Sequence, residues 1–285
     1  MNPDHERYWK ELDILDRDRL RITFEEFKPG YVLHLAARTD LKETRSLDGY
    51  EANVAGVRNT VEVIAGCPSV RRTIFASSRM VYRIGYQPRD EYDTCPPNLY
   101  GESKVLGERI VRESGLNSEW LIVRPTSIWG PWFDVPYRIF FDMIQKGYYA
   151  HILNHNPRKS FGFVGNTVYQ LHKLLLANSE LVNGKTTYLA DYPPLQLKEW
   201  SQLIAREMGK TIRTLPMAPL RMAASVGDLF YRFGWYRVPL TNFRLNNIIT
   251  EMVYETPLLE KVVGALPHDL ATGVRATVKW MHEFS

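Results

Sequence analysis

The sequence predicts an α/β fold built on a parallel sheet, followed by a second, smaller lobe that is mostly helical. In the first half, short apolar runs alternate with longer amphipathic segments, which is typical of strands joined by crossover helices. The runs VLHLAA and TIFAS are apolar throughout, as expected for strands that are covered on both faces. From residue 197 onward, apolar residues recur mainly at helical spacing, which predicts the second lobe.

The first half should contain three strands and two helices in alternation. The expected strands lie at 31–37, 72–78 and 120–125, and the expected helices at about 48–66 and 99–114. This order is that of a parallel sheet with crossover helices.

The second half is less regular. We expect a helix near 135–146, a strand and turn at 161–166, a helix near 167–178 and a strand at 186–191. The segment LKEWSQLIAREMGK then repeats apolar residues at helical spacing. Its helix should end at Gly209, because glycine readily adopts the left-handed conformation of a helix cap.

Composition narrows the class of protein. The 285 residues include 45% hydrophobic and 24% charged residues, and no apolar run approaches the roughly 20 residues of a membrane span, so no membrane partner is expected. The first ten residues are too polar for a secretory signal, which favours a cytoplasmic protein. The net charge is +4, but the Lys and Arg residues are scattered along the sequence and form no basic cluster. This argues against a nucleic-acid partner. Cys67 and Cys95 are too few for a disulfide framework or a cysteine metal site.

A tyrosine and a lysine form the clearest chemical pattern. Tyr100 and Lys104 are four residues apart in a predicted helix, so their side chains share one face. An ammonium beside a phenol stabilises the phenolate and lowers the phenol pKa, which lets tyrosine exchange protons near neutral pH. Alone, such a pair is far more often an ordinary surface tyrosine and lysine, because the pattern is short.

Polar residues follow two of the predicted strands. Ser77 and Ser78 end the strand at 72–78, and Pro125, Thr126 and Ser127 follow the strand at 120–125. Ligands bind beyond the carboxyl ends of strands in open parallel sheets, so these residues and the Tyr100 helix should converge on one crevice. The alternatives are serines that cap backbone groups, expected more of Ser77 than of Ser78, and a simple turn at 125–127.

Three motifs in this order carry a family resemblance: SSxxVY at 77–82, YxxxK at 100–104 and RPxxxxGP at 124–131. Together they resemble the extended short-chain dehydrogenase/reductases, the NAD-dependent nucleotide-sugar epimerase/dehydratase family. Further matches extend the resemblance over nearly the whole chain: DILD at 13–16, HLAA at 34–37, NVAGVRNTVE at 53–62 and LTNFR at 240–244.

The resemblance implies a doubly wound parallel sheet of the Rossmann type. It places a dinucleotide-binding domain at 1–133 plus about 161–191, and a substrate-binding lobe at about 134–160 and 192–285. It also implies a homodimer formed through the helix at 53–66 and the YxxxK helix.

Site residues follow from the same resemblance, position by position. Ser78 would hold the reacting oxygen, Tyr100 would exchange its proton, and Lys104 would tune Tyr100 and contact the nicotinamide ribose. The implied cofactor contacts, besides Tyr100 and Lys104, are Asp13, Ile14, Leu35, Ala36, Ala37, Asn53, Ser77 and Pro125. The implied substrate contacts, besides Ser78, are Thr126, Ser127, Lys159 (or its neighbour Arg158) and Arg244. For the basic residue at 158–159 and for Arg244, the alternative is a solvated charge on the surface.

The implied reaction uses NAD, with NADP as an alternative, to oxidise a hydroxyl of a small-molecule substrate, a nucleotide-activated sugar, to a transient ketone. Returning hydride to the other face gives a 4-epimerase, and releasing the ketone gives a dehydrogenase. Related dehydratases carry an acidic pair where this chain has Arg79 and Met80, so dehydration is disfavoured. The other candidates are a hydroxysteroid or sterol-type dehydrogenase and an inactive homologue that acts as a scaffold.

The family's glycine-rich GxxGxxG loop, which precedes the DI motif and binds the cofactor pyrophosphate, does not occur in the sequence. We therefore expect the gene product to begin roughly 35 to 50 residues upstream, the length of a strand, helix and strand. The alternative is a shortened and inactive homologue.

Overall fold

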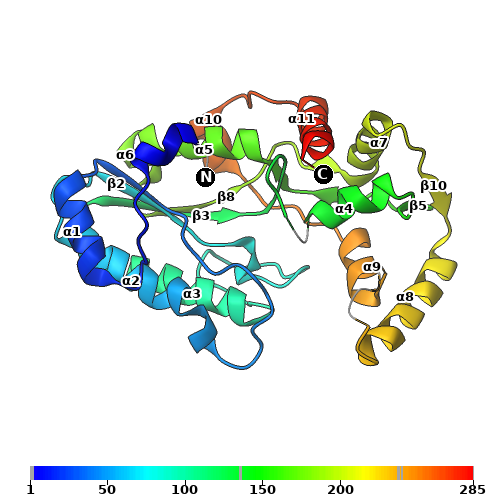
Figure 1. Ribbon diagram of the computed structural model, residues 1–285, viewed down its shortest axis with the longest axis horizontal. Coiled ribbons are helices and arrows are strands. Elements are labelled where there is room, and N and C mark those ends of the chain that lie inside the picture. The colour runs from blue at the N-terminus through cyan, green and yellow to red at the C-terminus, as the bar shows by residue number, and fades with distance from the viewer. Residues whose placement is uncertain (1–2, 135–136, 236–237, 239, 285) are drawn as a thin grey trace. The chain divides into compact units, whose positions relative to one another are not determined.

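A four-stranded sheet organises the first part of the chain (Figure 1). The strands lie in the order β1 (Tyr31–His34), β2 (Arg72–Ala76), β3 (Glu119–Pro125) and β8 (Lys185–Leu189). Both β1 with β2 and β2 with β3 are parallel, with Leu33 opposite Ile74 and Ile74 opposite Leu121. The predicted α/β class, a Rossmann-like parallel sheet with helices, is confirmed in this computed structural model, which describes residues 3–134, 137–235, 238 and 240–284.

The chain packs into two compact units. The first comprises Met1–Arg83, Pro88–Arg124 and Leu175–Thr187, and the second comprises Ile84–Gln87, Pro125–Leu174 and Tyr188–Ser285. These units are defined by packing alone. The predicted division into a dinucleotide-binding domain and a substrate-binding lobe concerns ligands and stays a prediction.

Three helices form a layer on one face of the sheet in the first unit: α1 (Arg17–Phe27), α2 (Glu51–Ala65) and α3 (Leu99–Arg112) (Figure 1). Asp16 begins α1 by accepting from the Arg19 N–H, and Asn98 begins α3 by accepting from the Gly101 N–H. Helices α2 and α3 pack closely, and a Cβ on Gly107 would lie 3.2 Å from the Asn53 carbonyl oxygen. The predicted homodimer through these two helices stays a prediction.

The core of the first unit shows why the run TIFAS in β2 is apolar throughout. Phe75 and Ile122 pack against Val57 and Ile64 of α2, whereas Ile74, which points to the opposite face of the sheet, is also fully buried. The central strand β2 is therefore covered on both faces, as the sequence predicts. The same prediction is wrong for β1, where Leu33 is 42% exposed.

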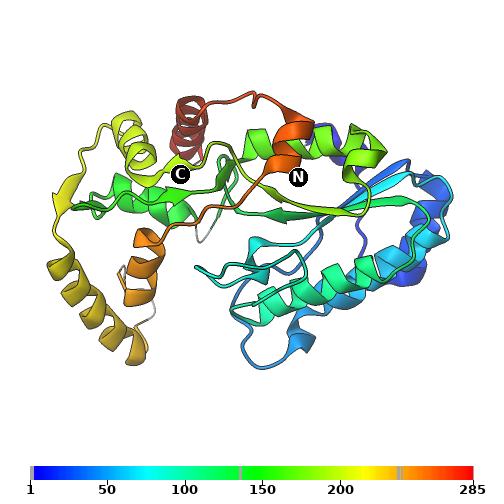
Figure 2. The same cartoon turned by 180° about the vertical axis from the view of Figure 1, so that it is seen from behind.

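The second unit contains three small sheets: β4 (Ser127–Trp129) with β7 (Phe161–Phe163), β5 (Ala150–Ile152) with β10 (Arg213–Leu215), and β6 (Arg158–Lys159) with β9 (Leu195–Gln196). Its helices, labelled in Figure 1 and seen from behind in Figure 2, are α4 (Tyr137–Gln145), α5 (Val164–Leu176), α7 (Leu197–Glu207), α8 (Met217–Arg232), α9 (Asn242–Ile249), α10 (Pro257–Val263) and α11 (Leu270–Glu283). Trp129 is buried in the core among the rings of Phe141, Phe163 and Trp200. The short elements η1 (Pro3–Tyr8), η2 (Leu47–Tyr50), η3 (Arg79–Val81) and α6 (Ser179–Val182) complete the described structure.

The predicted elements are mostly present, with corrections at their ends. The first two strands end earlier than predicted, at His34 and Ala76, and Val164–Asn166 is the first turn of α5 instead of a turn after the strand. Residues 135–136 of the predicted helix at 135–146 lie outside the described residues. Gly209 has a φ of +63°, so the predicted left-handed cap after α7 is confirmed. No helix of the described residues is long and apolar enough to cross a bilayer.

Candidate active site

Ser77 and Ser78 lie just beyond the carboxyl end of β2, and both are buried. The Ser78 Oγ accepts from the Met80 N–H at 3.1 Å and so caps η3, whereas the Ser77 Oγ donates to the Glu108 carboxylate at 2.6 Å. The expectation that Ser77 is the capping serine is therefore wrong. Strand pairing carries β2 only to Ala76, so the chain turns at Ser78, where a hydroxyl can satisfy an N–H of the new turn.

The η3 turn packs directly on the first turn of α3. A Cβ on Gly101 would lie 2.2 Å from the Met80 carbonyl oxygen, so only glycine allows this contact without a backbone shift. Gly101 follows Tyr100, and Met80 lies two residues after Ser78. The close approach therefore brings the strand end that carries Ser78 to the helix turn that carries Tyr100.

Tyr100 and Lys104 share the buried face of α3, as their spacing predicts. The Lys104 Nζ donates to the Ala76 carbonyl oxygen at 3.0 Å and lies 6.0 Å from the centre of the Tyr100 ring. Burial lowers the pKa of Lys104 to about 8, although the negative charge of Glu108 opposes this shift. The structure thus brings Ser77, Ser78, Tyr100 and Lys104 together at the carboxyl end of β2.

A buried ion pair supports this strand end. Arg124 of β3 donates from Nε and Nη2 to the two oxygens of Glu108 on α3, at 2.8 and 2.7 Å. Because Ser77 donates to the same carboxylate, Glu108 joins β2, β3 and α3 in one hydrogen-bonded group. Such a fork between a guanidinium and a carboxylate fixes geometry as well as charge.

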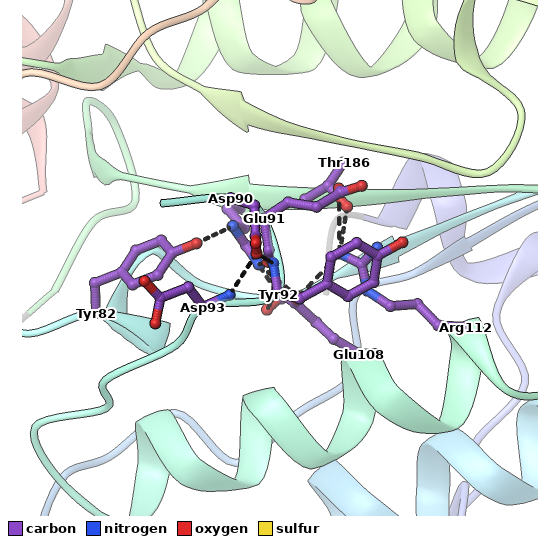
Figure 3. Close-up of polar contacts among 10 residues, drawn as sticks. Tyr82, Asp90, Glu91, Tyr92, Asp93, Glu108, Arg112 and Thr186 are labelled. Atoms are coloured by element: carbon purple, nitrogen blue, oxygen red, sulfur yellow. Dashed lines mark hydrogen bonds and ion pairs between the residues drawn. The ribbon is translucent and has the colours of Figure 1, made fainter. Parts of the chain in front are cut away.

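The network continues outward from this pair (Figure 3). Arg124 also donates to the Tyr82 hydroxyl at 2.7 Å and to the Glu91 carbonyl oxygen at 2.8 Å. Arg112 reaches the Thr186 hydroxyl at 2.6 Å and lies 3.4 Å from carboxylate oxygens of Glu91 and Glu108. The loop that carries Glu91 is therefore tied to the same network as the strand end.

The end of β1 is held by a second polar group. The side-chain oxygen of Asn53 accepts from the Arg38 N–H at 2.8 Å, and its amide donates to the Arg38 carbonyl and to the Ser103 hydroxyl. These bonds fix the loop after β1 to α2 and α3. Leu35 and Ala36 in that loop are exposed, so the strand end is open to a ligand.

His34, the last residue of β1, is buried, and its Nδ1 lies 3.3 Å from the Thr60 hydroxyl. Burial, together with the charge of Lys104, lowers the His34 pKa to about 4, so the ring is neutral at pH 7.

Asp13 and Ile14 lie in the turn that precedes α1. Asp13 accepts from the Leu15 N–H at 2.9 Å, and the Ile14 side chain packs on Gly56 of α2, where an added Cβ would lie 2.4 Å from the Ile14 Cδ1. The structure thus gives both residues a local packing role. Their implied contact with the adenine stays a prediction.

The remaining predicted contacts belong to the second unit, with Pro125 at the end of β3. Thr126 and Ser127 are buried, and the Thr126 hydroxyl donates to the Leu189 carbonyl oxygen. Pro125 ends β3 and Ser127 begins β4, so the alternative of a simple turn at 125–127 is wrong. The Lys159 ammonium is buried and donates to the Asn247 carbonyl at 2.7 Å and to the Thr250 carbonyl, near the end of α9. The alternative of a solvated surface charge is therefore wrong for Lys159.

Arg244 lies on α9, is half-buried, and donates to the Val238 carbonyl oxygen. Its predicted contact with substrate, like that of Lys159, stays a prediction.

Sequence reasoning missed Glu108, Arg124 and His34 as members of this region. Arg124 is the first residue of the RPxxxxGP segment, and Glu108 falls one helical turn after Lys104, the last residue of the YxxxK segment, on the same face. That spacing could have identified Glu108. Nothing in the sequence indicates that Arg124, in an apolar strand, reaches across to it.

The residues of the first unit fit one end of a nicotinamide dinucleotide. The buried Lys104 ammonium carries three donors, and a ribose hydroxyl can accept one of them beside the bond to Ala76. The open loop at Leu35 and Ala36 leaves room for a ligand at the neighbouring strand end. Ligands of open α/β sheets bind at such strand ends.

Comparisons with known proteins agree with this arrangement. The family described as "NAD dependent epimerase/dehydratase family" matches residues 2–189. The chain is 24% identical to a sterol-4-alpha-carboxylate 3-dehydrogenase from Gibberella zeae, over 94% of this chain and 96% of that protein. It is 23% identical to the N-acetyl-alpha-D-glucosaminyl-diphospho-ditrans,octacis-undecaprenol 4-epimerase of Escherichia coli O157:H7, over 94% and 82% of the two chains. Among solved structures, UDP-glucuronic acid 4-epimerase from Bacillus cereus, in complex with UDP-glucuronic acid and NAD, gives a TM-score of 0.70 at 14% identity, over 96% and 81%.

Proposed function

The chain belongs to the NAD-dependent epimerase/dehydratase family, and from this premise we propose that it oxidises or epimerises a nucleotide-activated sugar through a transient ketone. The observation that carries the proposal is the buried Lys104 cation, which shares a helix face with Tyr100 beside the strand end of Ser78. This is the arrangement that a proton-exchanging tyrosine requires.

In this proposal each residue has a defined task. Tyr100, as phenolate, takes the proton of a substrate hydroxyl and later returns it. The Lys104 ammonium stabilises that phenolate, and its burial strengthens the effect because few water molecules screen the charge. The Ser78 hydroxyl donates to the reacting oxygen. A nicotinamide held near Lys104 would supply reversible hydride transfer.

The Bacillus cereus neighbour, in complex with UDP-glucuronic acid and NAD, supports a nucleotide-activated sugar as substrate. The Escherichia coli relative is a 4-epimerase of a sugar linked by diphosphate to undecaprenol, so it supports the diphosphate-linked sugar and not the nucleotide. We infer NAD as the cofactor on the same basis. Arg79 and Met80 follow Ser78 where an elimination would need carboxylates, so we infer epimerisation or oxidation and not dehydration.

A sterol-type dehydrogenase is the second candidate function. It is favoured by the Gibberella zeae relative, which aligns over nearly its whole length with this chain. The same Ser78, Tyr100 and Lys104 chemistry would oxidise a sterol hydroxyl. Substrate choice is therefore what separates the two candidates.

The test is to incubate the full chain with NAD and either a panel of UDP-hexoses or a hydroxysterol, and to follow epimer or ketone by mass spectrometry and chromatography. Tyr100→Phe should lower kcat by about 100-fold or more and leave NAD binding, measured by calorimetry, unchanged. Tyr8→Phe, at an exposed tyrosine, is the matched control and should behave as wild type. Wild-type protein that binds no NAD would favour the scaffold candidate, and full activity in Tyr100→Phe would refute the proposed role of Tyr100.

A further inference from the structure

Helix α8 is apolar on two opposite sides. One side is buried: Ala224 is inaccessible to solvent, and a Cβ on Gly227 would lie 1.9 Å from the Leu240 carbonyl oxygen. This side packs with Leu245 of α9 into a small apolar cluster. Helices α8 and α9 lie side by side (Figure 1). A helix with a single buried side would normally present polar residues on the other.

The other side of α8 is apolar and exposed instead. Met222, Val226, Leu229 and Phe233 are 72%, 51%, 52% and 76% exposed. Their spacings of four, three and four residues return to the same side of a helix at each step. Nothing in the described chain covers this stripe.

Two aromatic residues extend the stripe. Phe230 and Trp235 stack at 5.4 Å between ring centres, and both are exposed, Trp235 by 68%. We call the six residues Met222, Val226, Leu229, Phe230, Phe233 and Trp235 the α8 apolar surface. An apolar surface of this kind on a folded protein marks a contact with another molecule or with a membrane.

The charges around the α8 apolar surface indicate what it contacts. Asp228 is the one carboxylate residue between 208 and 249, and it accepts hydrogen bonds from Asn242. Among the described residues of the same stretch, the exposed cations are Lys210, Arg213, Arg221 and Arg232. A second copy of the chain would bring the same cations against each other, whereas an anionic partner would be attracted.

We propose that the α8 apolar surface docks onto an anionic lipid bilayer, with α8 lying in the plane of the interface. Phe, Trp and Leu on one side of a helix and Arg beside them are the features by which amphipathic helices bind such interfaces. Long arginine side chains can reach the lipid headgroups while the apolar residues enter the acyl boundary. The proposal departs from the expectation of no membrane partner, because that expectation rested on the lack of a membrane-spanning run and a peripheral contact needs none.

The test is sedimentation of the full chain with vesicles of phosphatidylcholine alone, and with vesicles that also contain phosphatidylglycerol. Wild-type protein should bind the anionic vesicles, and added salt should weaken the binding. Leu229→Ser with Phe233→Ser should lower the vesicle partition coefficient by more than about tenfold. Arg221→Glu with Arg232→Glu should lower it on the anionic vesicles. Trp9→Ser, at an exposed tryptophan outside the surface, is the matched control.

A second measurement locates the contact. Lipids brominated in their acyl chains should quench tryptophan emission in wild-type protein, and Trp235→Phe should remove most of the quenching. The substituted side chains are exposed, so the circular dichroism spectrum and unfolding transition should stay unchanged. Absence of wild-type binding to anionic vesicles would overturn the proposal. A wild-type dimer that Leu229→Ser with Phe233→Ser converts to a monomer, without vesicle binding, would assign the surface to a second copy.

Discussion

Removing the Glu108 carboxylate should destabilise the protein strongly. Glu108 is 5% exposed and Arg124 2% exposed, and three donors lie within 2.8 Å of the Glu108 carboxylate: the Ser77 hydroxyl and two nitrogens of Arg124. Glu108→Ala leaves the Arg124 guanidinium buried without its counter-charge. Breaking a buried pair in this way costs about 3–5 kcal/mol of the free energy of unfolding.

The assay is urea unfolding followed by tryptophan fluorescence and by circular dichroism. Glu62→Ala is the control, because Glu62 pairs with Arg17 at the surface, where an ion pair contributes less than about 1 kcal/mol. The double variant Glu108→Leu with Arg124→Met removes both charges, so it should be more stable than Glu108→Ala alone. The reasoning is refuted if Glu108→Ala lies within about 1 kcal/mol of wild type, or if the double variant is less stable than Glu108→Ala.

Two further predictions concern the end of β1. The folded-state pKa of His34 is about 4, below its ordinary value of 6.5, so the unfolded state binds more protons between these values and stability falls as pH falls through that range. The loss of unfolding free energy should reach about 3 kcal/mol at pH 4. In unfolding curves measured at several pH values, His34→Gln should remove this pH-dependent loss. The control His155→Gln, at an exposed histidine, should retain it. Asn53→Ala removes the hydrogen bonds to Arg38 and Ser103 and should lower the free energy of unfolding by about 2–3 kcal/mol. A change below about 0.5 kcal/mol in urea unfolding would contradict the role of Asn53 in holding the loop after β1.

The sequence predicts those parts of the fold that local pattern determines. Helix α3 was expected at 99–114 and runs over Leu99–Arg112, because Asn98 supplies a cap and the apolar residues keep helical spacing. Strand β10 was missed because Arg213, Thr214 and Leu215 are all exposed and show no alternation of apolar and polar residues. Its pairing depends on β5, which lies more than sixty residues earlier, and a local pattern carries no information about that contact.

The candidate site was predictable to the same extent. Tyr100 and Lys104 were found because their spacing in one helix is itself the signal. The capping hydroxyl was expected at Ser77 and is that of Ser78, because the choice depends on where β2 stops pairing and on the carboxylate that approaches Ser77 from α3. Both depend on tertiary contacts, which the local sequence does not indicate.

The Glu108 network bears directly on the charge that Tyr100 experiences. Glu108 stands one turn after Lys104 on α3 and could have formed an ion pair with it. Arg124 and Ser77 instead engage both of its oxygens, and the Lys104 ammonium donates to the neutral Ala76 carbonyl. A lysine bonded to a carboxylate would exert little net electrostatic potential on its neighbours. The Lys104 ammonium is bonded to a neutral carbonyl, so its positive potential acts on Tyr100. The Glu108 charge still favours the protonated form of Lys104. Because Arg124 balances that carboxylate, Glu108 cancels less of the positive potential that Lys104 exerts on Tyr100, on which the proposed proton exchange depends.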